Sequence, residues 1–501
     1  MEASKQNTRL WWGAVFALAL LGFALRAYGS GESPAGDELT MYTLVHNRSF
    51  GSMMTLVVDQ EKTPPLGFAL SWLGSRLGPA DTWMRAPSVL AGTALVPLVA
   101  LLGTRTASRA AGLVAAALVA VSPFLLFYGI ESRSYALAAC FTCASLVLLL
   151  RATEDERSGA GPWMAWCLAA LAAFLSHYTA VFVIAASIVW VLTARPKARK
   201  AILLSCGGIA LALLPWLPSF LTQLSHSGDE ARRVASLAPL GLSSVWEVLS
   251  RSLVGHPVWS SLRAVTLQEV PGTTGLVLIL TGVGVATVSL AVQAARGDRP
   301  KPNALHGLLL LTATASIVGL IIGSLRPHHS MLLPRNAICS LPSIAVLAGL
   351  LLTRQPKALA LVVSLLVAIG LLLGSVTSLR DLNRPNMRAA AHAIEGRWKP
   401  GDALLESIYF NGPPTDLTAH LSPELRKQLQ ITREVGTKPF EQAVWIGQTV
   451  FTVGPVSPRT GPPLGPPPNL KSHFKAVWTQ TWKGLLPVTA TEWQPDTARK
   501  R

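Results

Sequence analysis

Two adjacent carboxylates follow the first long apolar run of the sequence. Asp37 and Glu38 stand about ten residues beyond the run Leu10–Leu25, where a membrane surface is expected if that run crosses a bilayer. A carboxylate that is partly removed from water has a raised pKa, and it can then take a proton from a hydroxyl group. Asp37 and Glu38 are therefore candidate catalytic residues.

Three further polar groups lie beside apolar runs. Glu131, Arg133 and Tyr135 fall in GIESRSYAL, His177 falls in FLSHYTAVF, and Arg335 falls in LRPHHSMLLPRNAI. Arginine binds phosphate through paired, charge-assisted hydrogen bonds. If a carboxylate deprotonates an acceptor hydroxyl while cations stabilise a departing phosphate, the set predicts transfer of a group from a lipid phosphate.

Each group also fits a plainer role. Asp37 and Glu38 suit the N-terminus of a surface helix. Glu131 and Arg133 suit an ion pair, and Arg335 suits an anchor at the lipid headgroups. The neighbouring His328 and His329 lack a third ligand at a useful spacing, so no metal site is predicted there.

Composition excludes an ordinary soluble enzyme. Half of the 501 residues are hydrophobic, 14% are charged and the mean hydropathy is +0.42, which predicts a polytopic α-helical membrane protein. The net charge of +17 does not indicate nucleic-acid binding, because the basic residues sit in short loops beside apolar runs. The first run lacks a small-x-small cleavage site, which predicts a retained span.

About eleven runs are long enough to cross a bilayer. They lie near 10–28, 83–104, 110–130, 134–151, 163–176, 178–194, 200–221, 272–293, 304–325, 336–353 and 357–378. With the N-terminus inside, the loops at 105–109, 151–157, 195–200, 296–301 and 354–357 are all short, basic and internal, as the positive-inside rule requires. All the candidate residues then face outward, which predicts a cell (plasma or inner) membrane protein with an extracytoplasmic site.

Two domains are expected. Residues 1–379 form the transmembrane domain, whose first outer loop, 29–82, carries a flat interfacial helix at 63–78. A short tilted span is the alternative for 63–78, and it would invert every later loop. Residues 380–501 form a small extracytoplasmic α/β domain, with a helix in NMRAAAHAIEGRW, strands in DALLES and QAVWIGQTVFTV, and a proline-rich segment at 453–470.

The ordered series DEL, TPPLGFALSWL, SPFLLFYGIESRSYAL and LSHYTA resembles the GT-C glycosyltransferases of the protein O-mannosyltransferase and aminoarabinose-transferase type, over roughly residues 10–400. The resemblance implies an inverting enzyme that moves a monosaccharide from a polyprenyl-phosphate carrier to a lipid, glycan or protein acceptor on the outer membrane face. It also implies that Asp37 is the catalytic base and that Glu38 is the accompanying acid.

The same resemblance assigns the remaining residues to the donor. Glu131, Arg133 and Tyr135 match an E-x-R-x-Y motif, while His177 falls in a loop near the carrier phosphate. Arg335 matches an arginine that a tyrosine commonly follows, whereas this chain has Asn336.

No nucleotide-binding or HExxH motif is present in the sequence, so no cofactor is expected and a divalent cation is optional. Cys140 and Cys143 fall inside a predicted span, which disfavours a redox or zinc pair. Three rival functions stay open: a secondary transporter, a noncatalytic subunit of a polysaccharide or glycolipid assembly system, and a transferase of whole oligosaccharides.

Overall fold

The computed structural model describes residues 2–34, 36–154, 159–225, 238–257, 265–298, 303–326, 328–381, 384–399, 402–406, 430–432, 450–455, 474–483 and 487–496, with scattered residues in 228–236 and 417–425. These residues form two compact units. Unit 1 comprises Met1–Ser30, Leu44–Val258 and Val265–Ser378, and unit 2 includes Gly31–Thr43 and Leu379–Arg501.

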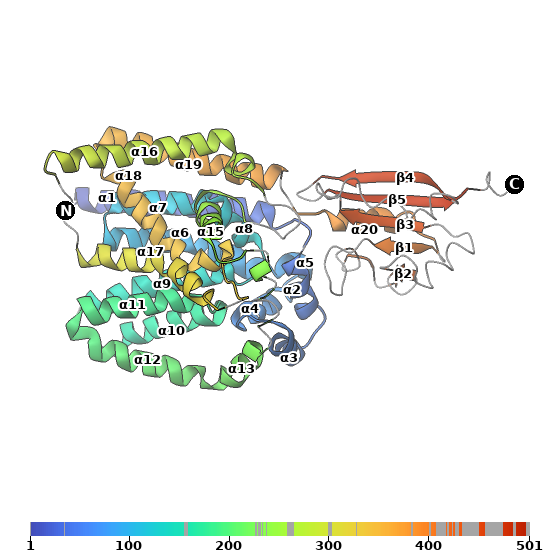
Figure 1. Cartoon of the computed structure of the whole chain (residues 1–501), viewed down its shortest axis with the longest axis horizontal. Coiled ribbons are helices and arrows are strands. Elements are labelled where there is room, and N and C mark those ends of the chain that lie inside the picture. Colours follow the sequence, from blue (N-terminus) through green and yellow to red (C-terminus); the bar gives the residue numbers. More distant parts are fainter. Residues whose placement is uncertain are drawn as a thin grey trace. The chain divides into compact units, whose positions relative to one another are not determined.

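Unit 1 is a bundle of long helices (Figure 1). The bundle helices are α1 (Glu2–Gly29), α6 (Ala86–Thr106), α7 (Arg109–Val121), α8 (Pro123–Ile130), α9 (Tyr135–Glu154), α10 (Ala160–Ser176), α11 (Ala180–Ala194), α12 (Arg199–Leu213), α13 (Leu217–Ser225), α16 (Thr273–Ala295), α17 (Ala304–Gly323), α18 (Leu341–Thr353) and α19 (Lys357–Asp381). Shorter connecting elements are α3 (Phe50–Gln60), α4 (Leu66–Gly74), α5 (Ala80–Trp83), η1 (Pro196–Ala198), η2 (Leu214–Trp216), α15 (Leu242–Val254), η3 (Gln268–Gly272) and η4 (Pro334–Ser340). Helix α2 (Asp37–Val45) belongs mostly to unit 2.

The polytopic helical fold predicted from composition is confirmed. Within the described residues, eight helical stretches are long and apolar enough to cross a bilayer. The other three predicted runs differ from simple spans. Residues 109–130 form two helices bent by 59° at Ser122, and α10 and α11, with 17 and 15 residues, are about 26 and 23 Å long.

Segment 63–78 contains α4, a nine-residue helix. At 1.5 Å per residue it is about 14 Å long, roughly half the thickness of a bilayer core. It packs on the bundle, where Leu70 contacts a buried cluster of Ala91, Ala136, Leu137 and Cys140. That length is too short for the alternative of a short tilted span, while the interfacial position of the helix stays a prediction.

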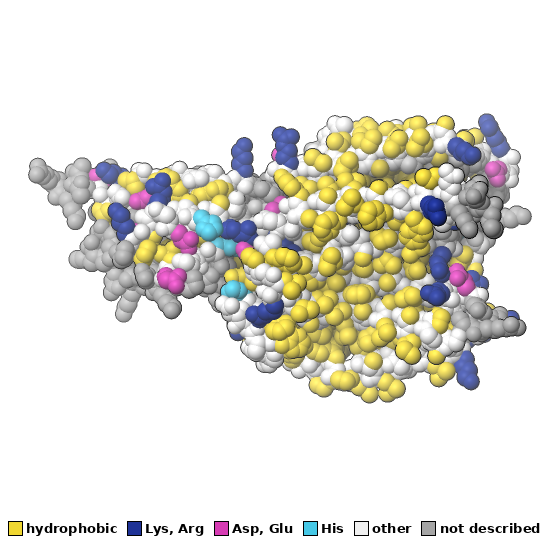
Figure 2. Space-filling model, turned by 180° about the vertical axis from the view of Figure 1, so that it is seen from behind, with side chains coloured by type: hydrophobic (Ala, Val, Ile, Leu, Met, Phe, Trp, Pro, Cys, Tyr) yellow, Lys and Arg dark blue, Asp and Glu magenta, His cyan; other side chains and the backbone are white. Residues whose placement is uncertain are grey.

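The outer surface of the bundle is apolar. Figure 2 shows a broad hydrophobic surface over the helices, with lysine and arginine side chains at both of its ends. Leu90, Leu204 and Leu280 are each more than 60% exposed, at 63, 66 and 61%. Such contiguous exposure is unfavourable in water and favourable against lipid tails, so unit 1 is a multi-pass membrane bundle.

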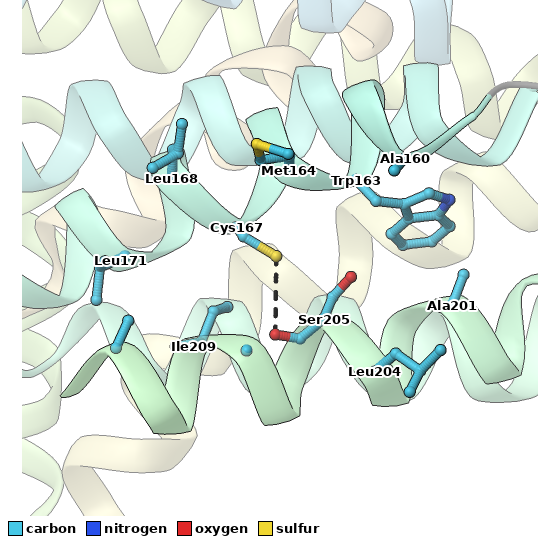
Figure 3. A pocket seen from close by; sticks show the side chains of 12 residues that line it. Ala160, Trp163, Met164, Cys167, Leu168, Leu171, Ala201, Leu204, Ser205 and Ile209 are labelled. Carbon is cyan, nitrogen blue, oxygen red and sulfur yellow. Dashed lines mark hydrogen bonds between the residues drawn. The ribbon is translucent and has the colours of Figure 1, made fainter. Parts of the chain in front are cut away.

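One apolar cavity of about 500 Å³ opens between α10 and α12 (Figure 3). Trp163, Leu168 and Ile209 line it, and its few polar atoms include the Cys167 thiol, which donates to the Ser205 carbonyl at 3.7 Å. Its lining includes no carboxylate, arginine or histidine. The cavity therefore offers no acid–base chemistry, and the candidate site is built elsewhere.

Unit 2 confirms the small α/β architecture predicted for the C-terminal region. Its strands are β1 (Ala403–Glu406), β2 (Gln430–Thr432), β3 (Val450–Pro455), β4 (Phe474–Trp482) and β5 (Val488–Pro495), in the order β2-β1-β3-β5-β4. β1 pairs in parallel with β2 and β3, whereas β5 pairs antiparallel with β3 and β4. Of the predicted strand 442–453, the part before Val450 lies outside the described residues, as does the proline-rich segment after Pro455.

Helix α20 (Met387–Glu395) supplies the core of unit 2. The Asn386 side chain caps its N-terminus by accepting from the Ala389 amide at 3.1 Å. Its buried residues, Met387, Ala390, Ala391 and Ile394, follow the helical spacing and pack with Leu404, Val488 and Ala490 of the sheet. The predicted helix in NMRAAAHAIEGRW is thus confirmed.

Candidate functional site

The turn Glu131–Ser134 joins α8 to α9 and carries two of the predicted site residues. Glu131 ends α8, where its backbone N–H donates to the Phe127 carbonyl at 3.1 Å, and its side chain is only 3% exposed. The Ser88 hydroxyl of α6 donates to the Arg133 carbonyl at 3.1 Å. Hydrogen bonds to α8 and α6 therefore hold the turn in place, as a binding site on a rigid scaffold requires.

Arg133 has an acidic partner that sequence reasoning missed. Its two terminal nitrogens, Nη1 and Nη2, donate to Glu61 Oε1 and Oε2, each at 3.2 Å, and both side chains are nearly buried, at 11 and 9% exposure. The Arg133 guanidinium also lies 5.6 Å from the ring of Phe68. Because both nitrogens engage the same carboxylate, this bidentate pair fixes the direction of the Arg133 guanidinium.

A close approach of α4 keeps this turn in place. A Cβ atom added at Gly67 would come 2.6 Å from Ser134 Cβ. We expect Gly67→Val to displace the turn, to cost about 1–3 kcal/mol of stability through overpacking, and to reduce donor turnover. Gly51→Val is the matched control, since a Cβ there meets nothing within 4 Å. Thermal melting and turnover check both variants, and equal behaviour of the two would contradict the assignment.

Aromatic rings connect this turn to the His177 turn between α10 and α11. The ring of Tyr135 lies 4.8 Å from that of Tyr128 and 5.2 Å from that of His177. Tyr135, Tyr128 and His177 are all buried, at 3, 3 and 7% exposure. Tyr128 was not among the predicted residues. It falls in the apolar stretch before Glu131, where its burial is explained by packing alone.

His177 is held as a neutral imidazole. Its Nδ1 accepts from the Thr179 backbone amide at 3.3 Å, which places the ring proton on Nε2 in the neutral form. Burial, together with the positive charges of Arg335 and Arg133, lowers the pKa of His177 from 6.5 to about 3. His177 therefore offers an Nε2–H hydrogen-bond donor and carries no positive charge.

This lowered pKa predicts a pH dependence of stability. The contribution of neutral His177 is complete above its unfolded pKa near 6.5, and it is lost as pH falls toward about 3. At about pH 5 we expect the wild type to lose about 2 kcal/mol relative to its stability at about pH 7.5 from this residue. His177→Gln, which does not titrate, should lose less over the same interval of thermal melting. An identical pH dependence in the two proteins would contradict the neutral histidine.

Arg335 joins the same cluster from η4. Its guanidinium carbon lies 5.8 Å from the centroid of the Tyr135 ring. η4 is fixed on α17 by Ser340, whose hydroxyl donates to the Thr312 carbonyl at 2.7 Å and accepts from the Ser316 amide at 3.1 Å. Asn336, which follows Arg335, donates to the Met331 carbonyl within the same loop at 2.8 Å.

Asp37 and Glu38 lie in unit 2 and open α2. Gly36, with a φ of +57°, makes the turn that starts this helix, and both acids fall in its first turn, as the helix-terminus alternative predicted. Glu38 is fully buried, with Oε2 2.9 Å from Arg384 Nε. Arg384 Nη1 also contacts Glu32 Oε2 at 3.1 Å. Asp37 is half-buried, and its role as base stays a prediction.

Replacing Glu38 is expected to lower the stability of unit 2. Glu38→Gln removes one partner of a buried ion pair, which typically costs about 3–5 kcal/mol because the other charge is left without its counter-ion. Glu32 offsets part of that loss by retaining its contact with Arg384. We expect unit 2 to melt at a lower temperature in Glu38→Gln, followed by calorimetry. Unchanged melting would show that the pair with Arg384 contributes little.

The described residues bring no group of three or more histidine, cysteine or acidic side chains within reach of one metal ion. His328 is exposed and has a φ of +57°, and the neighbouring His329 is partly exposed. Whether the reaction needs a divalent cation stays a prediction.

Comparisons with known proteins identify the fold of the chain. Residues 62–226 match the family model of dolichyl-phosphate-mannose-protein mannosyltransferases, a segment that contains Glu131, Arg133, Tyr135 and His177. A comparison with curated protein sequences finds no match.

Solved structures resemble the chain over nearly its whole length. ArnT from Cupriavidus metallidurans in the apo state shares 14% identity and a TM-score of 0.55, covering 97% of this chain and 98% of that one. The same protein bound to undecaprenyl phosphate gives 14% and 0.54, with 96 and 98% covered. AglB from Archaeoglobus fulgidus, an oligosaccharyltransferase in complex with an inhibitory peptide and a dolichol-phosphate, gives 12% and 0.53, with 90 and 70% covered.

These matches are to GT-C glycosyltransferases. The chain therefore has the GT-C fold of membrane glycosyltransferases, as its resemblance to that family implied.

Proposed function

We propose that this protein is an inverting glycosyltransferase that moves a monosaccharide from a polyprenyl phosphate to an acceptor hydroxyl at the outer face of the membrane. The observation that carries the proposal is the position of Arg335, 5.8 Å from the centroid of the Tyr135 ring, which itself lies 5.2 Å from the ring of the buried His177. Arg133 lies two residues before Tyr135, and burial, followed by the charges of Arg335 and Arg133, lowers the pKa of His177. Two arginines near one buried imidazole suit an anion such as a phosphate.

The lipid phosphate is the leaving group in this reaction. The acceptor oxygen attacks the anomeric carbon from the face opposite the phosphate, and the bond between that carbon and the phosphate oxygen breaks. The electron pair stays on the phosphate, where Arg133, Arg335 and the Nε2–H of His177 would stabilise the developing charge. Glu61 would keep the Arg133 fork in direction, and Glu131 would orient the sugar or Arg133.

The base is assigned to Asp37, on the sequence resemblance. Its carboxylate would take the proton from the acceptor hydroxyl as the new bond forms, so that the proton ends on Asp37 and the negative charge on the phosphate. The buried pairing of Glu38 with Arg384 argues against an equal role for the two acids. The likeness to structures that hold undecaprenyl phosphate or a dolichol-phosphate supports the class of carrier.

The test is turnover by the purified protein in lipid nanodiscs with a panel of polyprenyl-phosphate monosaccharides and a panel of lipid, glycan and peptide acceptors. We expect release of polyprenyl phosphate with at least one donor and one acceptor. Turnover only with a lipid-linked oligosaccharide would replace this proposal with oligosaccharide transfer, the function of AglB. Sugar movement across the bilayer without bond cleavage would replace it with transport.

A further inference from the structure

Helix α13 exposes its leucine side chains and buries a glutamine. Its leucines Leu217, Leu221 and Leu224 are 45, 54 and 54% exposed, whereas Gln223 is the buried residue, at 2%. In a helix that faces lipid, apolar residues point outward without cost, so an inward glutamine indicates a specific polar contact.

Gln223 makes three hydrogen bonds to two different segments. Its Nε2 donates to the Val57 carbonyl at 3.0 Å and to the Thr63 carbonyl at 3.1 Å, and its Oε1 accepts from the Tyr178 hydroxyl at 2.6 Å. The Tyr178 hydroxyl in turn accepts from Trp216 Nε1 at 3.1 Å. The amide of Gln223 thus has partners on both its nitrogen and its oxygen, as a buried polar network requires to be stabilising.

Both segments lead directly to the cluster described above. The carbonyls of Val57 and Thr63 bracket Glu61, which holds Arg133, and α13 lies beside α3 (Figure 1). Tyr178 adjoins His177, whose ring packs on Tyr135 below Arg335. Burial raises the pKa of Tyr178, so its phenol keeps the proton that it donates to Gln223.

We propose that Gln223 is a positioning residue that sets the separation of Arg133 and Arg335 at the donor phosphate, by tying the Glu61 loop to the His177 turn. This inference rests on the proposed function. It gives α13 a part in donor binding, although Gln223 itself contacts neither arginine in the described hydrogen bonds.

The experiment compares Gln223→Met and Gln223→Glu with wild type. Methionine keeps the length of the side chain but loses the amide, so we expect the donor KM to rise about tenfold with kcat little changed. Amides between Val57 and Thr63 should exchange with deuterium faster. Ser225→Ala is the matched control, because its exposed hydroxyl donates to the Thr222 carbonyl of its own helix at 2.7 Å and, within the described residues, does not reach the Glu61 loop or the His177 turn.

Gln223→Glu adds a readout that a merely structural residue would not give. A protonated carboxyl can still donate to one of the two carbonyls, while the ionised form repels both, and burial raises its pKa. The donor KM of this variant should therefore rise with pH, while the KM of the methionine variant does not follow it. A wild-type KM in both variants would overturn the inference. Wild-type turnover of the donor panel is a separate result, and its absence would overturn the proposed function first.

Discussion

Replacing Asp37 by asparagine is expected to lower the turnover of a lipid-linked sugar by roughly 10²–10⁴-fold while leaving thermal melting unchanged. Asparagine keeps the size and the hydrogen-bonding oxygen of the side chain but does not accept the proton of the attacking hydroxyl. Asp37 is half-buried in the first turn of α2, where asparagine is also well tolerated. The measurement is initial-rate release of polyprenyl phosphate at saturating donor.

Glu38→Gln is the matched control for this variant. Glu38→Gln should lower the melting temperature of unit 2, because Glu38 is fully buried against Arg384. Any loss of turnover in this variant should be proportional to the loss of folded protein. If Asp37→Asn turned over at the wild-type rate, Asp37 would be no more than a residue at a helix terminus. The assignment of the base would then fail.

Replacing Arg335 by alanine is expected to reduce kcat/KM for the donor by about 10²–10³-fold, which corresponds to about 2.7–4 kcal/mol of lost transition-state stabilisation. Arg335 brings a positive charge to the Tyr135–His177 pair, 5.8 Å above the Tyr135 ring. Lysine at this position keeps the charge but loses the planar fork, so Arg335→Lys should recover only part of the activity. Steady-state kinetics with a purified donor measure both effects.

Arg76→Ala is the control for Arg335. Arg76 also lies over an aromatic ring, 4.8 Å from Trp72, but it is exposed and belongs to the α4–α5 connection. Its removal tests whether loss of any arginine on an aromatic ring lowers activity. Equal kinetics of the Arg335 and Arg76 variants would contradict a donor role for Arg335.

Hydropathy alone predicted where the bundle helices lie, because each span needs a long apolar stretch whatever its neighbours are. It did not predict the 59° bend at Ser122, since both α7 and α8 are apolar and the serine–proline break adds no charge. Strands β4 and β5 were also missed. Their threonine- and tryptophan-rich sequences carry no clean alternation, and β4 is irregular between Ala476 and Trp478.

The sequence selected candidate site residues, whose functional roles stay predictions, but it did not predict the ion pairs that two of them make. Residue type and membrane side were enough to select Arg133, His177 and Arg335. The partner of Arg133, Glu61, lies 72 residues earlier, and the partner of Glu38, Arg384, lies in the C-terminal unit. Single-sequence patterns report only near neighbours along a helix or strand, so neither pairing had a signal. His177 was taken for a residue near the phosphate without the burial that makes it neutral.

The proposed reaction is best tested by product analysis of one wild-type reaction, with mass spectrometry and NMR of the anomeric carbon. We expect one polyprenyl phosphate to be released for each monosaccharide transferred, with the anomeric configuration inverted relative to the donor. Release of a polyprenyl pyrophosphate, transfer of a whole glycan, or retention of configuration would contradict it.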